Sequence, residues 1–229
     1  MRWVKTKDRF VAYFDILGFK NQVNDNHNKA LTSLQHLSDF RDIFSNNKTT
    51  LSPITGSVIV IDKTIKGVFF SDSIVFVSID DSQLSAIQIL SISQAFISSC
   101  MNEKIPIKGC ISFGKFTADF KKSIFVGTPL INAFLLEEEL ELIACIVDNH
   151  FEKQTQYIPS ISSFLVNYKT PLKSGYINHS LVNWIDIYIS KDSLDKTMSS
   201  MYLNVSGKPR RYLDNTINFI KHVRECKLI

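Results

Sequence analysis

Two aspartates stand beside strongly apolar segments, where an acidic residue can serve as a metal ligand. Asp15 lies near the end of Arg9–Ile16 (RFVAYFDI), whose aromatic and β-branched residues predict a buried strand. Asp72 separates the apolar segments 66–70 and 74–78. Taken singly, Asp15 could cap the following helix and Asp72 could be a turn residue. An ionised carboxylate at such a position otherwise needs a cation, N–H donors or water.

The order of the predicted elements brings the two acids together. The first half of the chain predicts a strand at 9–16, a helix from Gly18 to about Asn46, and strands at 57–61, 66–70 and 74–78. It then predicts a helix that is capped by residues 80–82 and ends near Asn102, followed by a strand at 106–116. This βαββαβ order predicts an α+β fold with a ferredoxin-like, palm-type core. In such a sheet the first strand lies beside the central hairpin, so Asp15 and Asp72 can meet at one sheet edge.

Two carboxylates at one place predict a particular chemistry. They repel each other unless a divalent cation lies between them. Ligation by oxygen alone suits Mg²⁺ or Mn²⁺ carrying a phosphate-bearing substrate, and two such ions can activate an attacking oxygen and stabilise a leaving one. Gly18 and Phe19 open a helix directly after the first acid, so their backbone N–H groups could face phosphate oxygens.

The second half of the chain has a less regular pattern. It predicts a strand at 123–126, a helix with Thr128 as N-cap and Pro129 at its first position, a solvated acidic face at 137–141 and a strand at 142–147. Beyond these it predicts a helix near 151–166, a loop around Pro171 and Gly175, a strand at 181–189 and a final helix at about 209–225. No linker divides the chain. We expect one domain over 1–229, with a core at about 9–148 and a C-terminal extension at about 149–229.

The composition is that of an ordinary globular chain. Of the 229 residues, 45% are hydrophobic and 21% charged, and the net charge of +4 suits an anionic ligand without predicting a nucleic-acid surface. No apolar stretch approaches the roughly 18 residues of a membrane span, and the first residues do not resemble a signal peptide. The four cysteines lack metal spacing and are expected to be buried thiols. We therefore expect a cytoplasmic protein without nucleic-acid or membrane partners.

Four blocks of the sequence resemble, in order, the motifs of class III nucleotidyl cyclases. They are FDILGF at 14–19, SDS at 71–73, KGCISFG at 108–114 and GTPLINA at 127–133, and the resemblance covers about residues 9–148. The short stand-alone form, together with FDILGF, SDS, KGCIS and AFLLE, is similar to the pyrimidine cyclases of bacterial Pycsar antiphage systems. That resemblance implies the cyclase fold, a homodimer with active sites at its interface, and cyclic UMP or cyclic CMP as the product.

The resemblance also implies roles for individual residues. Asp15 and Asp72 would be the two ligands of Mg²⁺ or Mn²⁺, with the Ile16 carbonyl as a further ligand. Gly18 and Phe19 would face the triphosphate of the substrate.

The sequence departs from the class III pattern on the helix after Gly127. In that family a transition-state Asn and Arg lie four and eight residues after this glycine, where the present chain has Ile131 and Leu135. Asn132 lies one residue after the position of the family's Asn and is the catalytic candidate that remains on this helix. Lys108 replaces the motif Arg, which keeps the charge but loses the bidentate fork of a guanidinium.

Three further residues complete the predicted site. Lys115 or Lys121 would neutralise phosphate charge in place of the missing Arg. Tyr13 lies two residues before Asp15 and shares its face in a strand, so it could contact the base, although packing in the core explains it better.

The sequence thus predicts a cyclase that converts UTP or CTP to a 3′,5′-cyclic monophosphate and pyrophosphate for antiphage signalling. Two alternatives stay open. One is a purine nucleotide cyclase, which the same two acids would serve. The other is a catalytically silent cyclase-like module that binds a nucleotide and dimerises, favoured by the missing Asn and Arg spacing.

Overall fold

The computed structural model describes residues 3–46, 48–51, 59–187 and 191–226. The predicted strand positions 57, 58, 188 and 189 lie outside the described residues. The elements, in chain order, are β1 (Thr6–Ile16), α1 (Phe19–Asp25), α2 (His27–Asn46), β2 (Lys48–Leu51), β3 (Ile59–Asp62), β4 (Ile65–Phe70), β5 (Ser73–Ser78), α3 (Gln83–Asn102), β6 (Ile107–Asp119), β7 (Ile124–Gly127), α4 (Thr128–Glu139), β8 (Cys145–Val147), α5 (Asn149–Thr155), the 3₁₀ helix η1 (Pro159–Phe164), β9 (Leu165–Leu172), β10 (Gly175–Val182), the 3₁₀ helix η2 (Ile185–Ile187), α6 (Lys191–Leu203) and α7 (Lys208–Cys226).

The predicted βαββαβ core is confirmed. Its strands lie in the order β4-β5-β1-β6, and the sheet continues through β8, β10 and β9, while β7 pairs with β6. Strand β1 runs antiparallel between β5 and β6, and β6 and β8 are parallel. The hairpin β4–β5 therefore lies directly beside β1, as the sequence order predicts. The single domain over 1–229 stays a prediction, although the C-terminal strands extend the sheet of the core.

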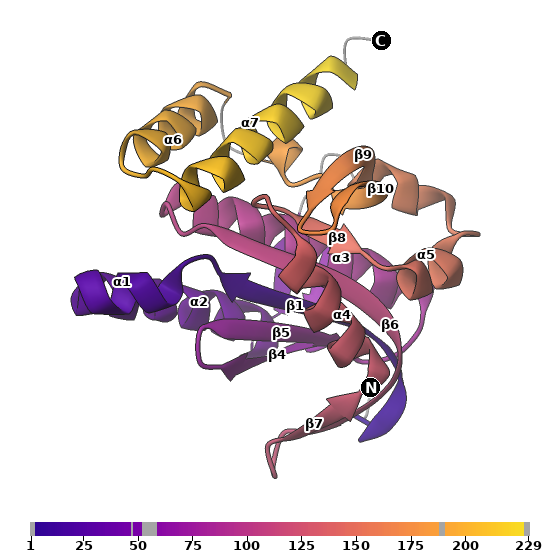
Figure 1. Ribbon diagram of the computed structural model, residues 1–229. Coiled ribbons are helices and arrows are strands. Elements are labelled where there is room, and N and C mark those ends of the chain that lie inside the picture. Colours follow the sequence, from indigo (N-terminus) through magenta and orange to yellow (C-terminus); the bar gives the residue numbers. More distant parts are fainter. Residues whose placement is uncertain (1–2, 47, 52–58, 188–190, 227–229) are drawn as a thin grey trace.

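Helices cover both faces of this sheet (Figure 1). On one face Phe14 of β1 packs against Phe76 of β5 and Phe96 of α3, with their ring centroids 5.1–6.2 Å apart. On the other face the ring of Tyr13 meets Phe134 of α4 edge-on at 5.6 Å. Because successive side chains of a strand point to opposite faces, Asp15 shares the α4 face with Tyr13.

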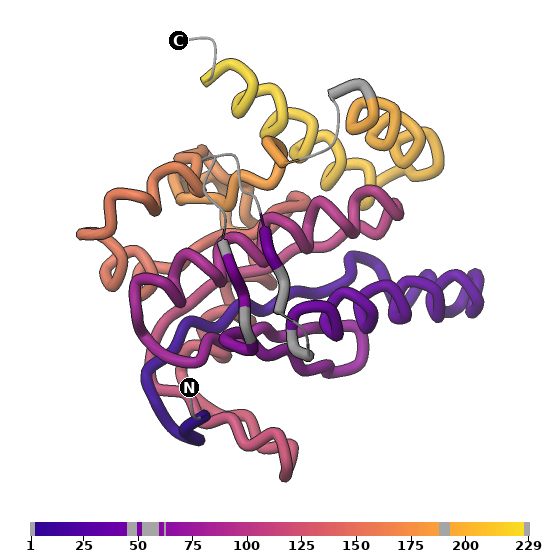
Figure 2. Tube along the Cα trace, turned by 180° about the vertical axis from the view of Figure 1, so that it is seen from behind, coloured from indigo at the N-terminus to yellow at the C-terminus, as the bar shows by residue number. Residues whose placement is uncertain are grey.

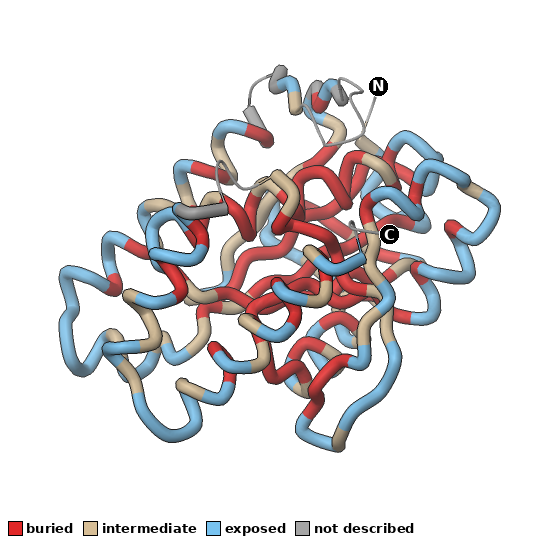
Figure 3. The backbone as a smooth tube through the Cα atoms, turned by 90° about the horizontal axis from the view of Figure 1, so that it is seen from above, coloured by how far each residue is buried: buried red, intermediate tan, exposed pale blue. Residues whose placement is uncertain are grey.

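The core lies between these layers, as Figure 3 shows, and helix α3 passes through it. The expectation that no apolar stretch is long enough for a membrane span was wrong for helix α3, which is long and apolar enough by length and composition, although most of its residues are buried in the molecule. Figure 2, which views the molecule from behind, shows it in front of the sheet, between the N-terminal elements and the C-terminal helices. Its apolar sequence is thus explained by packing on both sides. Cys100, Cys110 and Cys145 are buried as predicted, whereas Cys226 is exposed.

Glycine at position 109 allows β1 and β6 to pack closely. A Cβ atom there would come within 2.2 Å of the Phe14 ring and 2.6 Å of the Tyr13 carbonyl oxygen. Gly18 fits its place for another reason, since its φ of 74° lies in the left-handed region that other residues avoid. These two motif glycines therefore shape the strand and the turn on either side of Asp15.

The predictions for the second half were less accurate. The helix expected at 151–166 ends at Thr155, because Pro159 has no N–H group with which to continue it and η1 follows. The loop expected around Pro171 and Gly175 is instead the β9–β10 hairpin, in which Pro171 occupies the edge strand.

Several element boundaries also differ from those predicted, and the single helix predicted from Gly18 to about Asn46 is two helices, α1 and α2, separated by Asn26. The strand expected at 142–147 is only Cys145–Val147, and the strand expected at 181–189 lies earlier, at Gly175–Val182. The N-cap of α4 is Gly127, so the predicted cap, Thr128, is the first residue of the helix. Helix α6 was not predicted at all. The final helix was predicted correctly.

Candidate functional site

The two predicted acids lie at the same edge of the sheet. Asp15 of β1 is paired in register with Ser73 of β5, and Asp72 immediately precedes Ser73 in the turn of the β4–β5 hairpin. The last rung of that hairpin joins Phe70 to Ser73, which leaves a turn of two residues. Ser71 in this turn has a φ of 59°, a conformation that costs a non-glycine residue about 1 kcal/mol. The strained turn places Asp72 beside Asp15.

A chain of hydroxyl groups connects Tyr13 to Asp15. Ser73 Oγ donates to Asp15 Oδ1 over 2.8 Å, and Tyr13 Oη lies 2.7 Å from Ser73 Oγ. The Ser73 hydroxyl has a single proton, which it gives to Asp15, so Tyr13 must donate to Ser73. The hydroxyl proton of Tyr13 is therefore donated to Ser73 and is not available for a hydrogen bond to a ligand. Ser73 was missed from the sequence because a serine at a strand end has many structural roles.

Burial raises the pKa of Asp15 to about 6. The Ser73 hydrogen bond opposes this shift, the charge of Asp72 raises the pKa further, and that of Lys108 lowers it. The carboxylate therefore lacks enough positive charge among its own neighbours. A site of this kind gains free energy by binding a cation, because the cation offsets both the desolvation of Asp15 and its repulsion by Asp72.

Lys108 is paired with a carboxylate of helix α4. It stands opposite Asp15 in the β1–β6 register, and its Nζ lies 3.1 Å from Glu137 Oε1 and donates to the Glu137 carbonyl over 2.9 Å. Both side chains are almost completely buried. The ammonium group thus lies beneath the site, where it acts on Asp15 through its charge.

The prediction of a solvated acidic face at 137–141 was wrong for two of its residues. Glu137 is buried against Lys108, and burial raises its pKa to about 7. Glu141 is buried as well and pairs with Arg211 of α7. The pattern of α4 contained the signal, since Glu137 follows the buried residues Pro129 and Ala133 at intervals of four and so falls on the inner stripe of the helix.

The donor set at the site fits a magnesium-type ion. Asp15, Asp72 and the carbonyl of Ile16 at the end of β1 all offer hard oxygen atoms. Among the residues that the structure describes, no group of three or more His, Cys, Asp or Glu side chains could hold a metal ion. Mg²⁺ needs no such group, because it is bound by one or two carboxylates and completes its shell with water and substrate phosphates. Asp15 and Asp72 would therefore hold it.

Gly18 and Phe19 follow the acid as predicted. Gly18 is the N-cap of α1 and Phe19 its first residue. The N–H of Leu17 donates to the Pro106 carbonyl over 2.9 Å, which ties the end of β1 to the start of β6. The turn that carries these residues is thus held at the sheet edge where Asp15 lies.

Two predicted residues lie elsewhere in the chain. Lys115 is exposed and pairs in register with Asp8, seven residues along β6 from Lys108, or about 23 Å at the rise of a strand. Lys115 is therefore far from Asp15 within one chain, and its contact with the substrate stays a prediction. Asn132 lies on α4 with its Nδ2 3.4 Å from His150 Nδ1, and its catalytic role stays a prediction.

Comparisons with known proteins bear on the fold. The sequence matches no protein-family model and no curated protein. The structure is similar to the monomeric guanylyl cyclase domain of the RhoGC fusion protein from the aquatic fungus Blastocladiella emersonii, with 14% identity and a TM-score of 0.52 over 80% of this chain and 98% of that one. It is similar to a dimeric form of that domain, with 14% identity and a TM-score of 0.53 over 79% and 98% of the two chains.

A third similar structure is the catalytic core of a rhodopsin-guanylyl cyclase with converted specificity, in complex with ATPαS. It has 14% identity and a TM-score of 0.50 over 78% of this chain and 97% of that one. These likenesses show that the chain has the palm-type α+β fold of class III cyclase domains.

Proposed function

We propose that this chain is a nucleotidyl cyclase, which converts a nucleoside triphosphate to a 3′,5′-cyclic monophosphate and pyrophosphate. The observation that carries the proposal is the meeting of Asp15 and Asp72 at one edge of a cyclase-type sheet. A purely structural protein would have no use for two carboxylates that repel each other there. The motif residues around both acids support the same reaction.

The residues of the site have separate tasks in this reaction. Divalent ions held by Asp15, Asp72 and the Ile16 carbonyl would lower the pKa of the ribose 3′-hydroxyl and neutralise phosphate charge. Ser73 fixes the orientation of Asp15 through its hydrogen bond. Gly18 and Phe19 face the triphosphate, whose α-phosphorus is attacked in line by the 3′-oxygen while pyrophosphate leaves. Most of the rate enhancement then comes from positioning and from charge neutralisation.

The proposed substrate is a pyrimidine nucleotide, UTP or CTP, and the proposed role is production of an antiphage second messenger in the cytoplasm. This part rests on the similarity of FDILGF, SDS, KGCIS and AFLLE to Pycsar cyclases. Tyr13 stays a prediction for contact with the base. Its hydroxyl proton already goes to Ser73, so only the ring and the oxygen lone pairs are left for a nucleotide.

We propose a homodimer as the active form. Five exposed apolar side chains, here called the α4–β7 patch, belong to consecutive elements on one side of the molecule (Figure 1): Ile124, Val126, Ile131, Phe134 and Leu135. Phe134 contacts Tyr13, so the patch reaches the face of the sheet that carries Asp15. A second copy covering this patch would bury the apolar side chains and enclose the site.

The test of the proposed function is a product assay by mass spectrometry. The purified chain is incubated separately with UTP, CTP, ATP and GTP in the presence of Mg²⁺ or Mn²⁺. We expect a cyclic pyrimidine monophosphate that is lost in the Asp72→Asn variant. Cyclisation of purines alone would keep the reaction and overturn the pyrimidine assignment.

One observation favours a second candidate, a silent module that binds a nucleotide and signals by dimerising. Helix α4 carries Ile131 and Leu135 where class III cyclases have Asn and Arg, and the nearby Lys108 is neutralised by Glu137. Nucleotide binding in a titration without any product from the four triphosphates would favour this candidate.

A further inference from the structure

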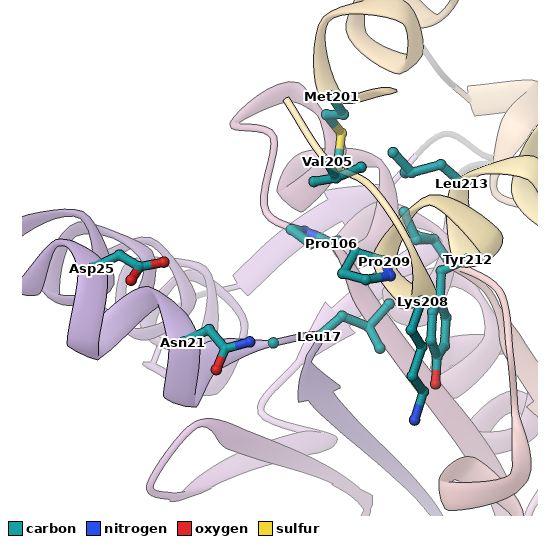
Figure 4. Close-up of a pocket in the computed structure, with 12 residues that line it drawn as sticks. Leu17, Asn21, Asp25, Pro106, Met201, Val205, Lys208, Pro209, Tyr212 and Leu213 are labelled. Carbon is teal, nitrogen blue, oxygen red and sulfur yellow. The ribbon is translucent and has the colours of Figure 1, made fainter. Parts of the chain in front are cut away.

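A cavity adjoins the predicted triphosphate site and is bounded by the C-terminal extension. Its volume is about 600 Å³. Leu17, Gly18 and Asn21 line it on the side of the β1–α1 turn, and Lys208 and Tyr212 line it on the side of α7 (Figure 4). Leu17 and Gly18 follow Asp15 by two and three residues, so the cavity begins where the carboxylate site ends.

The polar groups of α7 gather at one part of this cavity. In Figure 4 the ammonium group of Lys208 and the hydroxyl of Tyr212 point in the same direction, whereas Asp25 lies on α1, on the other side of the cavity. Most of the remaining lining is apolar: Leu17, Pro106, Ile143, Met201, Val205, Pro209 and Leu213. The side chain of Lys208 is exposed, so its ammonium group is accessible to an anionic ligand at this part of the cavity.

The end of α4 lies close both to the two acids and to the α7 side of the cavity. Lys108, opposite Asp15 in the β1–β6 register, donates to the Glu137 carbonyl over 2.9 Å. Arg211, next to Tyr212 on α7, pairs with Glu141, two residues beyond the end of α4. The cavity is therefore a close neighbour of the site that Asp15 and Asp72 form.

Other cations near the end of α4 are already paired. Lys108 is bound to Glu137, Lys173 lies 3.2 Å from Glu138, and Arg211 pairs with Glu141. Lys208 makes no ion pair with any residue that the structure describes. It is thus the lining cation of the cavity whose charge is available to a ligand.

We propose that Lys208 binds the phosphate chain of the nucleoside triphosphate in the same chain whose Asp15 and Asp72 hold the metal. This inference rests on the proposed function and assigns to the C-terminal extension the positive charge that α4 lacks. Tyr212 and Asn21 add neutral hydrogen-bond donors on either side of the cavity. The phosphate chain would pass from the carboxylates, along Gly18, to Lys208.

The test measures binding of inorganic tripolyphosphate, which has no base and no ribose, to the full chain by calorimetry at constant free Mg²⁺. We expect Lys208→Ala to weaken binding about tenfold, the usual size of one lost hydrogen bond to a charged group. The Lys208→Arg variant should recover most of the affinity. The matched control is Lys221→Ala, an exposed lysine of the same helix, 13 residues or about 20 Å further along its axis.

The outcomes separate this inference from the proposed function. Equal affinity in wild type and Lys208→Ala, equal losses in Lys208→Ala and Lys221→Ala, or no binding to the wild type would each overturn the role of Lys208. If tripolyphosphate binding depends on Lys208 but no triphosphate is cyclised, the role stands and the proposed function fails. If triphosphates are cyclised and the KM of Lys208→Ala is unchanged, the proposed function stands and the role of Lys208 fails.

Discussion

The hydroxyl of Ser73 donates to Oδ1 of Asp15 over 2.8 Å, from the residue directly opposite it on the neighbouring strand. The bond therefore depends on backbone register, and it holds one oxygen of the carboxylate while the other remains available. It also links Asp15 to Tyr13, because the tyrosine hydroxyl donates to Ser73. The carboxylate that we propose as a metal ligand and the Tyr13 hydroxyl on the same face of the sheet thus belong to one hydrogen-bonded unit.

We predict that removal of this link weakens metal binding. The Ser73 hydrogen bond lowers the pKa of Asp15, so Ser73→Ala should raise that pKa and reduce Mn²⁺ affinity about three- to tenfold near pH 6, the size of one hydrogen bond. Tyr13→Phe should give a smaller loss in the same direction. Electron paramagnetic resonance of free Mn²⁺ measures both. An affinity that is unchanged in Tyr13→Phe, together with an altered preference among nucleotides, would assign Tyr13 to the base instead.

Metal affinity should also depend on pH in a defined range. Burial and then the charge of Asp72 raise the pKa of Asp15 to about 6 in the metal-free protein. Below that pH the carboxyl group holds a proton that a metal ion must displace, so affinity should fall about tenfold for each unit of pH. Above about pH 7 it should level off. A profile that stays flat from pH 7 to pH 5 in the Mn²⁺ titration would show that Asp15 is not a ligand.

The same carboxylate should lower the stability of the metal-free protein. Because the folded pKa of Asp15 lies above its unfolded value, the folded state binds the proton more tightly, and stability decreases as pH rises from about 4 to 6. Asp15→Asn should therefore raise Tm at pH 7.5 by about 2–4 °C, for a gain near 1 kcal/mol after solvent screening. Turnover should be lost in the same variant. Calorimetry without metal is the measurement. A lower Tm would contradict the claim that the ionised Asp15 destabilises the metal-free protein.

Much of the site could be predicted from the sequence because its parts are local. Asp15 and Asp72 each stand beside an apolar strand, and the βαββαβ order forces those strands to be neighbours. Ser73 and Glu137 could not be assigned with equal ease, since their roles depend on a partner far away in the chain. Glu137 in particular belongs to a run of acidic residues, and only its position on the inner stripe of α4 distinguishes it from the other acids of that helix.

The C-terminal extension was the least predictable region. Its strands complete a sheet begun by other segments, so their short apolar runs are stabilised by pairing over long sequence distances. Helix α6 is held by contacts with α3 and α7. The cavity beside Gly18 depends on how these helices pack, which no local pattern in 191–226 specifies.

The buried pair Lys108–Glu137 should matter for stability before it matters for catalysis. Without Lys108 the buried Glu137 must either stay charged without a partner or take up a proton, so Lys108→Met should cost about 3 kcal/mol of unfolding free energy, while the double variant Lys108→Met/Glu137→Leu should recover most of it. Urea denaturation of Lys108→Met, Glu137→Leu and the double variant measures the coupling free energy between the two side chains. If Lys108→Met keeps full stability and yet loses turnover, Lys108 acts on the substrate directly.

The α4–β7 patch should control the oligomeric state. Ile131 is more than half exposed and lies one turn from Leu135, so an aspartate at position 131 would place a charge in the centre of any interface formed there. We expect Ile131→Asp to be monomeric by sedimentation at concentrations where the wild type is a dimer, and to lose turnover although Asp15 and Asp72 are intact. The matched control is Ile177→Asp on β10, an exposed isoleucine away from the patch, which should stay dimeric and active. A dimeric Ile131→Asp variant, or an active monomer, would place the interface elsewhere or show that one chain suffices.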